Sequence, residues 1–266
     1  MKPQLIAIWL GLSLVAVAAP SRAETRSEEE APAPRSWADT VRQSNANGTF
    51  LPLSLTPSVA TRSAEAAGFG GYDSAKGAAV LQSFAEARVV GPLALRAGAA
   101  LRDGEDELAP FIGARVQLLS QERHGVMAAV ALFYKAEGFT EAEGELETVL
   151  SLGTRVGRTL LLGNLAYGQD PEGNERDGEL RAAALVQLAS WVQLGFDARG
   201  RFDLGSERAK RLASNEPTYD VDAGPVASLA LGPLALAAHA GVSVIRRLDQ
   251  RAEGGAIVLA GLGTAF

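Results

Sequence analysis

The chain contains no cysteine and only two histidines, and aromatic residues make up 6% of its 266 positions. The absence of cysteine excludes disulfide bonds, thiolate metal sites and a lipid anchor on an N-terminal cysteine. Having only His124 and His239 restricts acid–base and nucleophilic catalysis, for which histidine is the most frequent side chain. Without disulfides, the protein must take its stability from a large core or from burial in a membrane.

Basic residues are also fewer than acidic ones, 25 against 31, which gives a net charge of −6. Nucleic-acid binding needs clustered Lys and Arg, so no nucleic-acid partner is expected. One uncharged stretch, 223–245, is long enough for a membrane-spanning helix. It contains Gly-Pro twice and splits into two alternating halves, which disfavours that helix.

The first 23 residues have the pattern of a secretory signal peptide. Lys2 precedes an apolar run, and Ser21-Arg22-Ala23 places small residues at the two positions that define a cleavage site before Glu24. Residues 24–48 are charged and carry prolines, with little to bury, and they predict a disordered segment, with a pore plug as the alternative.

From Thr49 onward, apolar residues recur with period two, which indicates strands with one apolar and one polar face. The clearest case is 192–203, where Leu194 and Phe196 alternate with Gln193 and Asp197. We predict about twelve strands, at 50–61, 77–90, 94–102, 108–119, 125–136, 144–156, 159–168, 179–188, 192–203, 219–231, 234–246 and 255–266. Two prolines weaken the first strand, so ten strands is the alternative.

The predicted connections alternate between short and long along the chain. Two-residue hairpin turns that begin with glycine are expected at Gly157-Arg158 and Gly232-Pro233, where residues of the same face then pair. At Gly91, residues of the same face can pair across the turn only if the loop has an odd number of residues. We therefore predict a three-residue loop, 91–93. The segment 62–76 is predicted to be a long loop.

The last twelve residues form an uncharged segment that ends on Phe266. This tail resembles the assembly signal of bacterial outer-membrane β-barrels, and short turns alternating with longer loops are typical of that class. The resemblance implies an all-β, closed antiparallel up-and-down transmembrane barrel over 49–266, with 24–48 as a periplasmic segment. It also implies location in the outer membrane of a Gram-negative-type bacterium, with outer-membrane lipid and the barrel assembly machinery as partners. A soluble secreted β-protein with the apolar faces turned inward around an apolar ligand is the alternative.

Charged residues on the polar face are the candidate pore lining. This set is Arg88, Arg96, Arg115, Arg155, Arg181, Asp197, Arg199 and Arg201. Rings of such side chains set ion selectivity in channels, and twelve strands leave more interior than the eight whose side chains just fill it. The sequence therefore predicts a passive porin-like channel for small polar or anionic solutes, with a non-conducting structural or surface-interaction barrel as the alternative.

Catalysis is not expected from the placement of the histidines. His239 is predicted to face the lumen, and Ser243 on the same strand is about 13 Å away at ~3.3 Å per residue. Outer-membrane phospholipases need a Ser–His pair near the lipid-facing wall, and acyltransferase barrels place a histidine with the outer loops. The sequence has neither arrangement, and no cofactor or metal site is predicted.

Overall fold

The computed structural model describes residues 51–56, 64–101, 108–139, 144–171, 176–205, 217–248 and 250–265. In these residues twelve β-strands and one short helix, α3 (Gln121–His124), are found. The strands are β1 (Ala64–Asp73), β2 (Ala78–Val90), β3 (Leu93–Leu101), β4 (Leu108–Leu119), β5 (Met127–Ala136), β6 (Gly144–Val156), β7 (Thr159–Gln169), β8 (Arg176–Ala189), β9 (Val192–Asp203), β10 (Pro217–Leu231), β11 (Leu234–Arg247) and β12 (Glu253–Ala265). No helix in the described part of the chain is long and apolar enough to cross a membrane.

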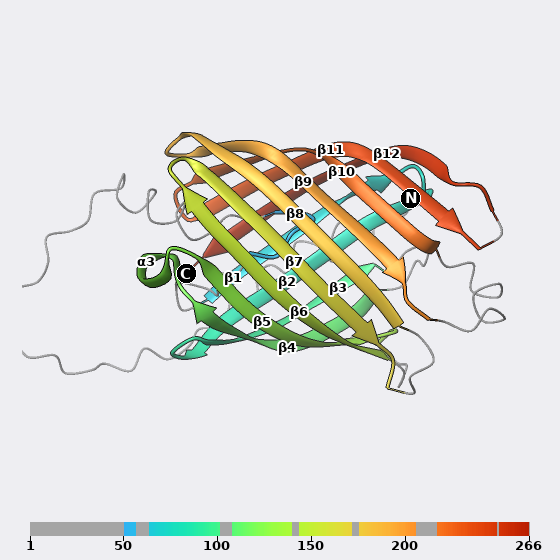
Figure 1. The fold of residues 1–266 in the computed structure, drawn as a ribbon, viewed down its shortest axis with the longest axis horizontal. Coiled ribbons are helices and arrows are strands. Elements are labelled where there is room, and N and C mark those ends of the chain that lie inside the picture. The colour runs from blue at the N-terminus through green and yellow to red at the C-terminus, as the bar shows by residue number, and fades with distance from the viewer. Residues whose placement is uncertain are drawn as a thin grey trace, which may run out of the picture.

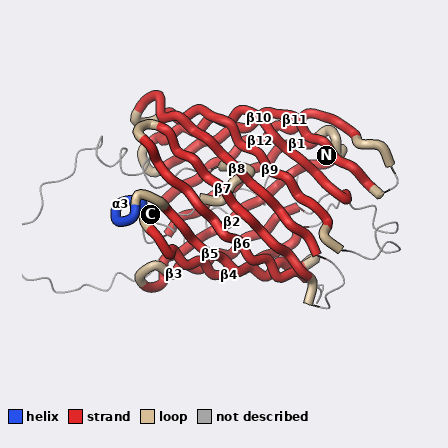
Figure 2. Tube along the Cα trace, in the orientation of Figure 1, coloured by secondary structure: helices blue, strands red, loops and turns tan. Residues whose placement is uncertain are grey.

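Each strand pairs antiparallel with its neighbours in chain order, and β1 pairs with β12 to close the barrel. Figures 1 and 2 show the strands strongly tilted around a common axis, as closure of a barrel requires. The all-β up-and-down barrel of twelve strands is therefore confirmed.

Large apolar side chains of the barrel wall point outward. Leu165 of β7 is 53% exposed and Phe196 of β9 is 51% exposed, whereas Asp197 is fully buried on the inner side. An apolar outer face with a polar interior is the arrangement of a membrane barrel and the reverse of a soluble one. The alternative of a soluble protein with its apolar faces turned inward is therefore wrong.

The two ends of the barrel differ in their connections. At one end, on the left of Figure 1, lie α3, the C-terminus and turns such as 157–158 and 232–233. We call this the short-turn end and the opposite one the long-loop end. The predicted registers at the two turns are confirmed, because Val156 pairs with Thr159 and Leu231 pairs with Leu234. Gly157 and Gly232 have φ of 59° and 68°, which favours glycine.

The predicted three-residue loop at 91–93 is wrong. β2 and β3 are joined by the two-residue turn 91–92, and Val90 pairs with Leu93. The change of face is made instead by an irregularity between Arg88 and Val90, where one extra residue stands on one strand. The extra residue that the facing residues require is therefore supplied by a bulge in the strand and not by the loop.

The predicted first strand is also wrong. Residues 51–56 belong to no strand and lie inside the barrel, where Leu51, Leu53 and Ser54 are buried. Part of the prediction, 57–61, falls outside the described residues. The first strand of the barrel is β1, within the segment predicted to be a long loop, and a four-residue turn, 74–77, joins it to β2.

Inside the wall, aromatic rings cover glycines of the neighbouring strand. A Cβ at Gly113 would lie 2.3 Å from Cδ1 of Phe133, and a Cβ at Gly98 would lie 2.6 Å from Cζ of Phe111. The two rings meet edge to face with centroids 6.1 Å apart. Each ring therefore fills space that a side chain would otherwise occupy and packs the β3–β5 wall.

Candidate functional site

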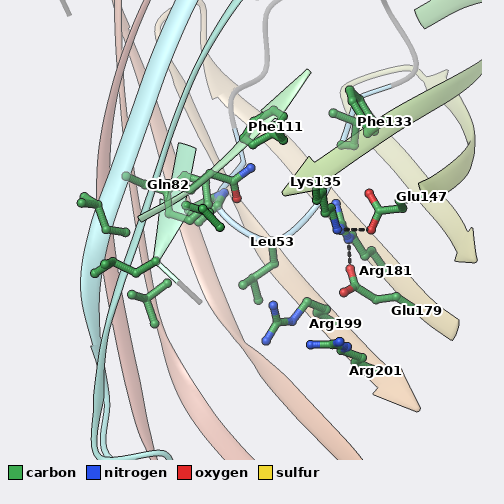
Figure 3. A pocket seen from close by; sticks show the side chains of 18 of the residues that line it. Leu53, Gln82, Phe111, Phe133, Lys135, Glu147, Glu179, Arg181, Arg199 and Arg201 are labelled. Carbon is green, nitrogen blue, oxygen red and sulfur yellow. Dashed lines mark hydrogen bonds and ion pairs between the residues drawn. The ribbon is translucent and has the colours of Figure 1, made fainter. Parts of the chain in front are cut away.

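The lumen holds a cavity of about 250 Å³ near the long-loop end, seen from close by in Figure 3. Its lining combines charged side chains from several strands with apolar side chains of the wall, among them Phe69, Phe111 and Ile257. Pro52, Leu53 and Leu55 of the segment 51–56 border it on the side of the short-turn end.

Two ion pairs on neighbouring parts of the wall are visible together in Figure 3. Lys135 of β5 pairs with Glu147 of β6, and Arg181 of β8 pairs with Glu179 on the same strand. Hydrogen bonds between ionised partners are the strong ones, so these pairs fix the side chains in place. The wall therefore presents both signs of charge side by side.

A second group of charges extends from β9 toward the β1–β2 turn. Arg199 of β9 lies 3.2 Å from Asp220 and 2.6 Å from Asp222, both buried on β10. Lys76, in the turn 74–77, places its Nζ 2.7 Å from Asp220. Arg201 pairs with Asp177 of β8. The turn thus supplies a cation to the lumen, and the arginines of β9 are matched by carboxylates on both neighbouring strands.

A buried cluster around Glu86 lies on the β2–β4 side of the lumen. The carboxylate of Glu86 accepts hydrogen bonds from Arg96 at 2.8 Å and from Arg115 at 2.6 Å. The guanidinium of Arg96 also lies 3.9 Å from the centre of the Phe84 ring and 3.5 Å from Glu65. Arginine carries several N–H donors on one planar group, so Arg96 can contact Glu86 and Glu65 at once while its plane lies over an aromatic ring.

The segment 51–56 is held to the wall by polar contacts with β9. The backbone N–H of Leu53 donates to Asp197 at 3.0 Å, and the hydroxyl of Ser54 donates to the other oxygen of the same carboxylate. Because Asp197 is fully buried, its charge is stabilised by these donors rather than by water.

The next two residues of the segment are held by β7 and β4. The side-chain amide of Asn164 accepts from the N–H of Leu55 at 2.8 Å and donates to its carbonyl at 2.6 Å, as a neighbouring strand would. Arg115 donates to the carbonyl of Thr56. Side chains of the wall thus satisfy backbone groups that pair with no strand.

Three leucines of the segment, Leu51, Leu53 and Leu55, are its apolar anchors. Leu53 packs with Ile257 and Leu259 of β12, and Leu55 packs against the group that contains Phe133. Leu51 belongs to a cluster toward the short-turn end. The members of that cluster are Leu51, Met127, Leu160, Leu162, Ala183, Leu185 and Val226. The lumen is therefore apolar and packed below the cavity.

The residues predicted to line the pore take three different positions. Arg96, Arg181, Arg199 and Arg201 line the cavity, Arg115 and Asp197 hold the segment 51–56, Arg88 is exposed near the short-turn end, and Arg155 lies half-buried near that end, 3.4 Å from Gln187. Phe266, predicted as the assembly signal, falls outside the described residues.

His239 is buried and faces the interior, as predicted, and neither of its ring nitrogens has a hydrogen-bond partner among the described residues. Ser243 donates to Asp73 rather than to a histidine. The described residues also contain no group of three or more acidic or histidine side chains placed to hold a metal ion. Among the residues that the structure describes, His239 therefore has no hydrogen-bonded serine of the kind that covalent catalysis requires.

Sequence reasoning missed two contributors to the lumen. Lys76 was assigned to a long loop, and the segment 51–56 was assigned to the wall. The polar partner Asn164 could have been found, because it falls on the inner face of the predicted strand 159–168.

No family model matches the chain, and no curated protein matches it in sequence. The NanC porin is similar in structure, with a TM-score of 0.55 and 8% identity over 76% of this chain and 100% of that one. The KdgM porin has a TM-score of 0.53 and 7% identity over 76% and 99% of the two chains. LpxR from Salmonella typhimurium has a TM-score of 0.50 and 8% identity over 77% and 100%.

These likenesses concern the fold. Because likenesses at 7–8% identity show the fold alone, they do not decide between transport and catalysis. The residues inside the barrel have to distinguish the two functions. The chain has the closed barrel fold of the bacterial outer-membrane, porin-like class, and no narrower family is assigned to it.

Proposed function

We propose that this protein is a passive outer-membrane channel for small polar solutes. The observation that supports this most is the charged cavity inside a wall whose outer face is apolar. Charged rings in a lumen attract and select polar solutes, and an apolar outer band suits lipid. The outer membrane is its proposed location after removal of residues 1–23, with lipid and the barrel assembly machinery as partners.

The pairing of charges defines the solute class more closely. Cations such as Lys135 and Arg181 lie directly beside the carboxylates Glu147 and Glu179. A wall of this kind offers donors and acceptors to uncharged polar solutes and to small anions alike. We therefore propose weak charge selectivity rather than the strongly anion-attracting wall that unpaired arginines would give.

Catalysis is a weaker candidate for this interior. Ser243 is bonded to Asp73, and His239 lies elsewhere on the same strand without an orienting partner among the described residues. A histidine base needs both a nucleophile and an orienting group within hydrogen-bond reach. We propose that the barrel is not an enzyme.

A non-conducting barrel is the second candidate, because the segment 51–56 and its apolar cluster occupy the lumen below the cavity. Recording from the refolded protein in planar bilayers separates the two. A channel gives unitary current steps, and the size of each step rises with the applied voltage. A barrel whose gel mobility changes on heating, as expected of a folded barrel, but which stays silent at every voltage even after 51–56 is released from Asp197, would favour the non-conducting alternative.

A further inference from the structure

The segment 51–56 crosses the route that a solute would follow, and it takes no part in the barrel wall. The twelve strands close the barrel among themselves, so the segment contributes no strand pairing. We propose that the segment 51–56 is an internal plug that holds the channel closed, and that the channel opens when the segment leaves Asp197 and Asn164. This inference rests on the proposed channel function.

The apolar contacts of Leu51 explain why the plugged state is closed. Leu51 is buried against Met127, Leu160 and Leu185 toward the short-turn end. A constriction lined by apolar side chains excludes water and therefore ions, which is one way in which channels gate. With Leu51 in place, the charged cavity has a dry floor, and solute that enters from the long-loop end stops there.

The polar contacts explain why the segment takes one specific position in the lumen rather than occupying it non-specifically. Asp197 accepts from the N–H of Leu53 and from the hydroxyl of Ser54, and Asn164 exchanges two hydrogen bonds with Leu55. Only side chains of the wall take part, so the segment can leave without breaking a hydrogen bond between strands. Water that enters the opened lumen would then solvate Asp197 and Asn164, so two discrete states are available to the same barrel.

A reversible cross-link tests the plug within one polypeptide, because the natural chain has no cysteine. The double variant Ser54→Cys with Asp197→Cys joins two side chains that are in contact. In the oxidised protein the segment is fixed, and the bilayer should be silent. Reduction removes the link, and since the bonds to Asp197 are already gone, the mean current should rise at least about tenfold over the oxidised form.

A matched pair of single variants tests the same contact without a cross-link. Ser54→Ala removes one hydrogen bond to a charged acceptor and should raise the mean current of a mostly closed channel by about tenfold. Ser228→Ala is the control, because Ser228 is a lumenal serine of similar exposure, 8% against 6%, that lies on β10. It should leave the current unchanged.

The outcomes separate the plug from the channel function. If the oxidised double variant conducts as well as the reduced one, or if the two cysteines stay free in the folded barrel, the plug is overturned while the channel stands. If all forms are silent although heat-dependent gel mobility shows a folded barrel, the channel function fails, and the plug fails with it. Silence on oxidation and current on reduction supports both.

Discussion

Arg115 of β4 contacts both Glu86 of β2 in the barrel wall and Thr56 of the segment inside the barrel. Its guanidinium lies 2.6 Å from the carboxylate of Glu86, and its other amino group donates to the carbonyl of Thr56. Glu86 also pairs with Arg96, which has Glu65 as a second carboxylate at 3.5 Å, and the side chains of Glu86, Arg96 and Arg115 are all buried. The three side chains form one connected cluster of ion pairs.

Glu86→Gln is therefore expected to be strongly destabilising. The substitution leaves Arg96 and Arg115 buried with Glu86 no longer charged, and breaking a buried pair costs about 3 to 5 kcal/mol. The loss of unfolding free energy is measured by denaturant titration in detergent micelles, with the heat-dependent gel mobility as the readout of the folded fraction. The comparison is Asp177→Asn, which breaks the partly exposed pair with Arg201 and should cost less than about 1 kcal/mol. Equal losses for the two variants would contradict this account.

The outward direction of the apolar face predicts the effect of charge on the wall. Leu165→Arg places a charge near the middle of β7 on the lipid side and should destabilise the barrel in a bilayer by about 2 to 4 kcal/mol. Val156→Arg, beside the turn 157–158, should cost about 1 kcal/mol or less. Unfolding free energies in lipid vesicles compare the two positions. A similar cost at both would argue against a membrane-spanning orientation.

Phe133→Ala is expected to lower the unfolding free energy strongly because the ring makes three sets of contacts. It covers Gly113, meets the edge of Phe111 and belongs to the group against which Leu55 packs. Removing a buried phenylalanine typically costs about 3 to 5 kcal/mol. The control is Phe196→Ala on the outer face, where lipid replaces the ring. If both substitutions cost the same in denaturant titrations, the interior ring does not carry this role.

Charge reversal in the cavity should change ion selectivity. Lys135→Glu replaces the cation beside Glu147 and leaves the upper lumen more negative. In a salt gradient, the reversal potential of the open channel should then shift toward the equilibrium potential of the cation. Arg246→Glu makes the same change on an exposed residue of β11 and should leave the potential as it was. An unchanged potential in Lys135→Glu would place the ion path elsewhere.

Most of the wall could be predicted from the sequence because lipid and lumen impose opposite polarities on successive residues of a strand. Val192–Asp203 was found with its bounds correct for that reason. β1 was missed because residues on its outer face such as Ala64, Ala66 and Gly70 are small, and the large exposed side chain Tyr72 comes near the end of the strand.

The segment 51–56 was misassigned for the opposite reason. Leu51, Leu53 and Leu55 alternate with period two, and this pattern reports an extended backbone without reporting which surface the leucines meet. Here they meet the inside of the barrel. Pro52 pointed to the difference, since proline cannot donate a hydrogen bond to a neighbouring strand.

The partners inside the lumen were beyond sequence reasoning. Arg181 and Arg199 were identified as lumenal, but a carboxylate on the same strand and two on the neighbouring strand neutralise them. Which side chains meet depends on rotamers as well as on register. The contact of Lys76 with Asp220 depends on a turn that was predicted to be part of a long loop.

The packing of Leu53 on Ile257 and Leu259 has a consequence for biosynthesis. These residues belong to β12, the last of the described strands in chain order, which pairs with β1 to close the barrel. The segment 51–56 and β1, close together in the sequence, thus both contact β12, one through its leucine and the other through its backbone. The barrel cannot close before β12 has been synthesised, and Leu53 offers that strand an apolar surface on the inner side.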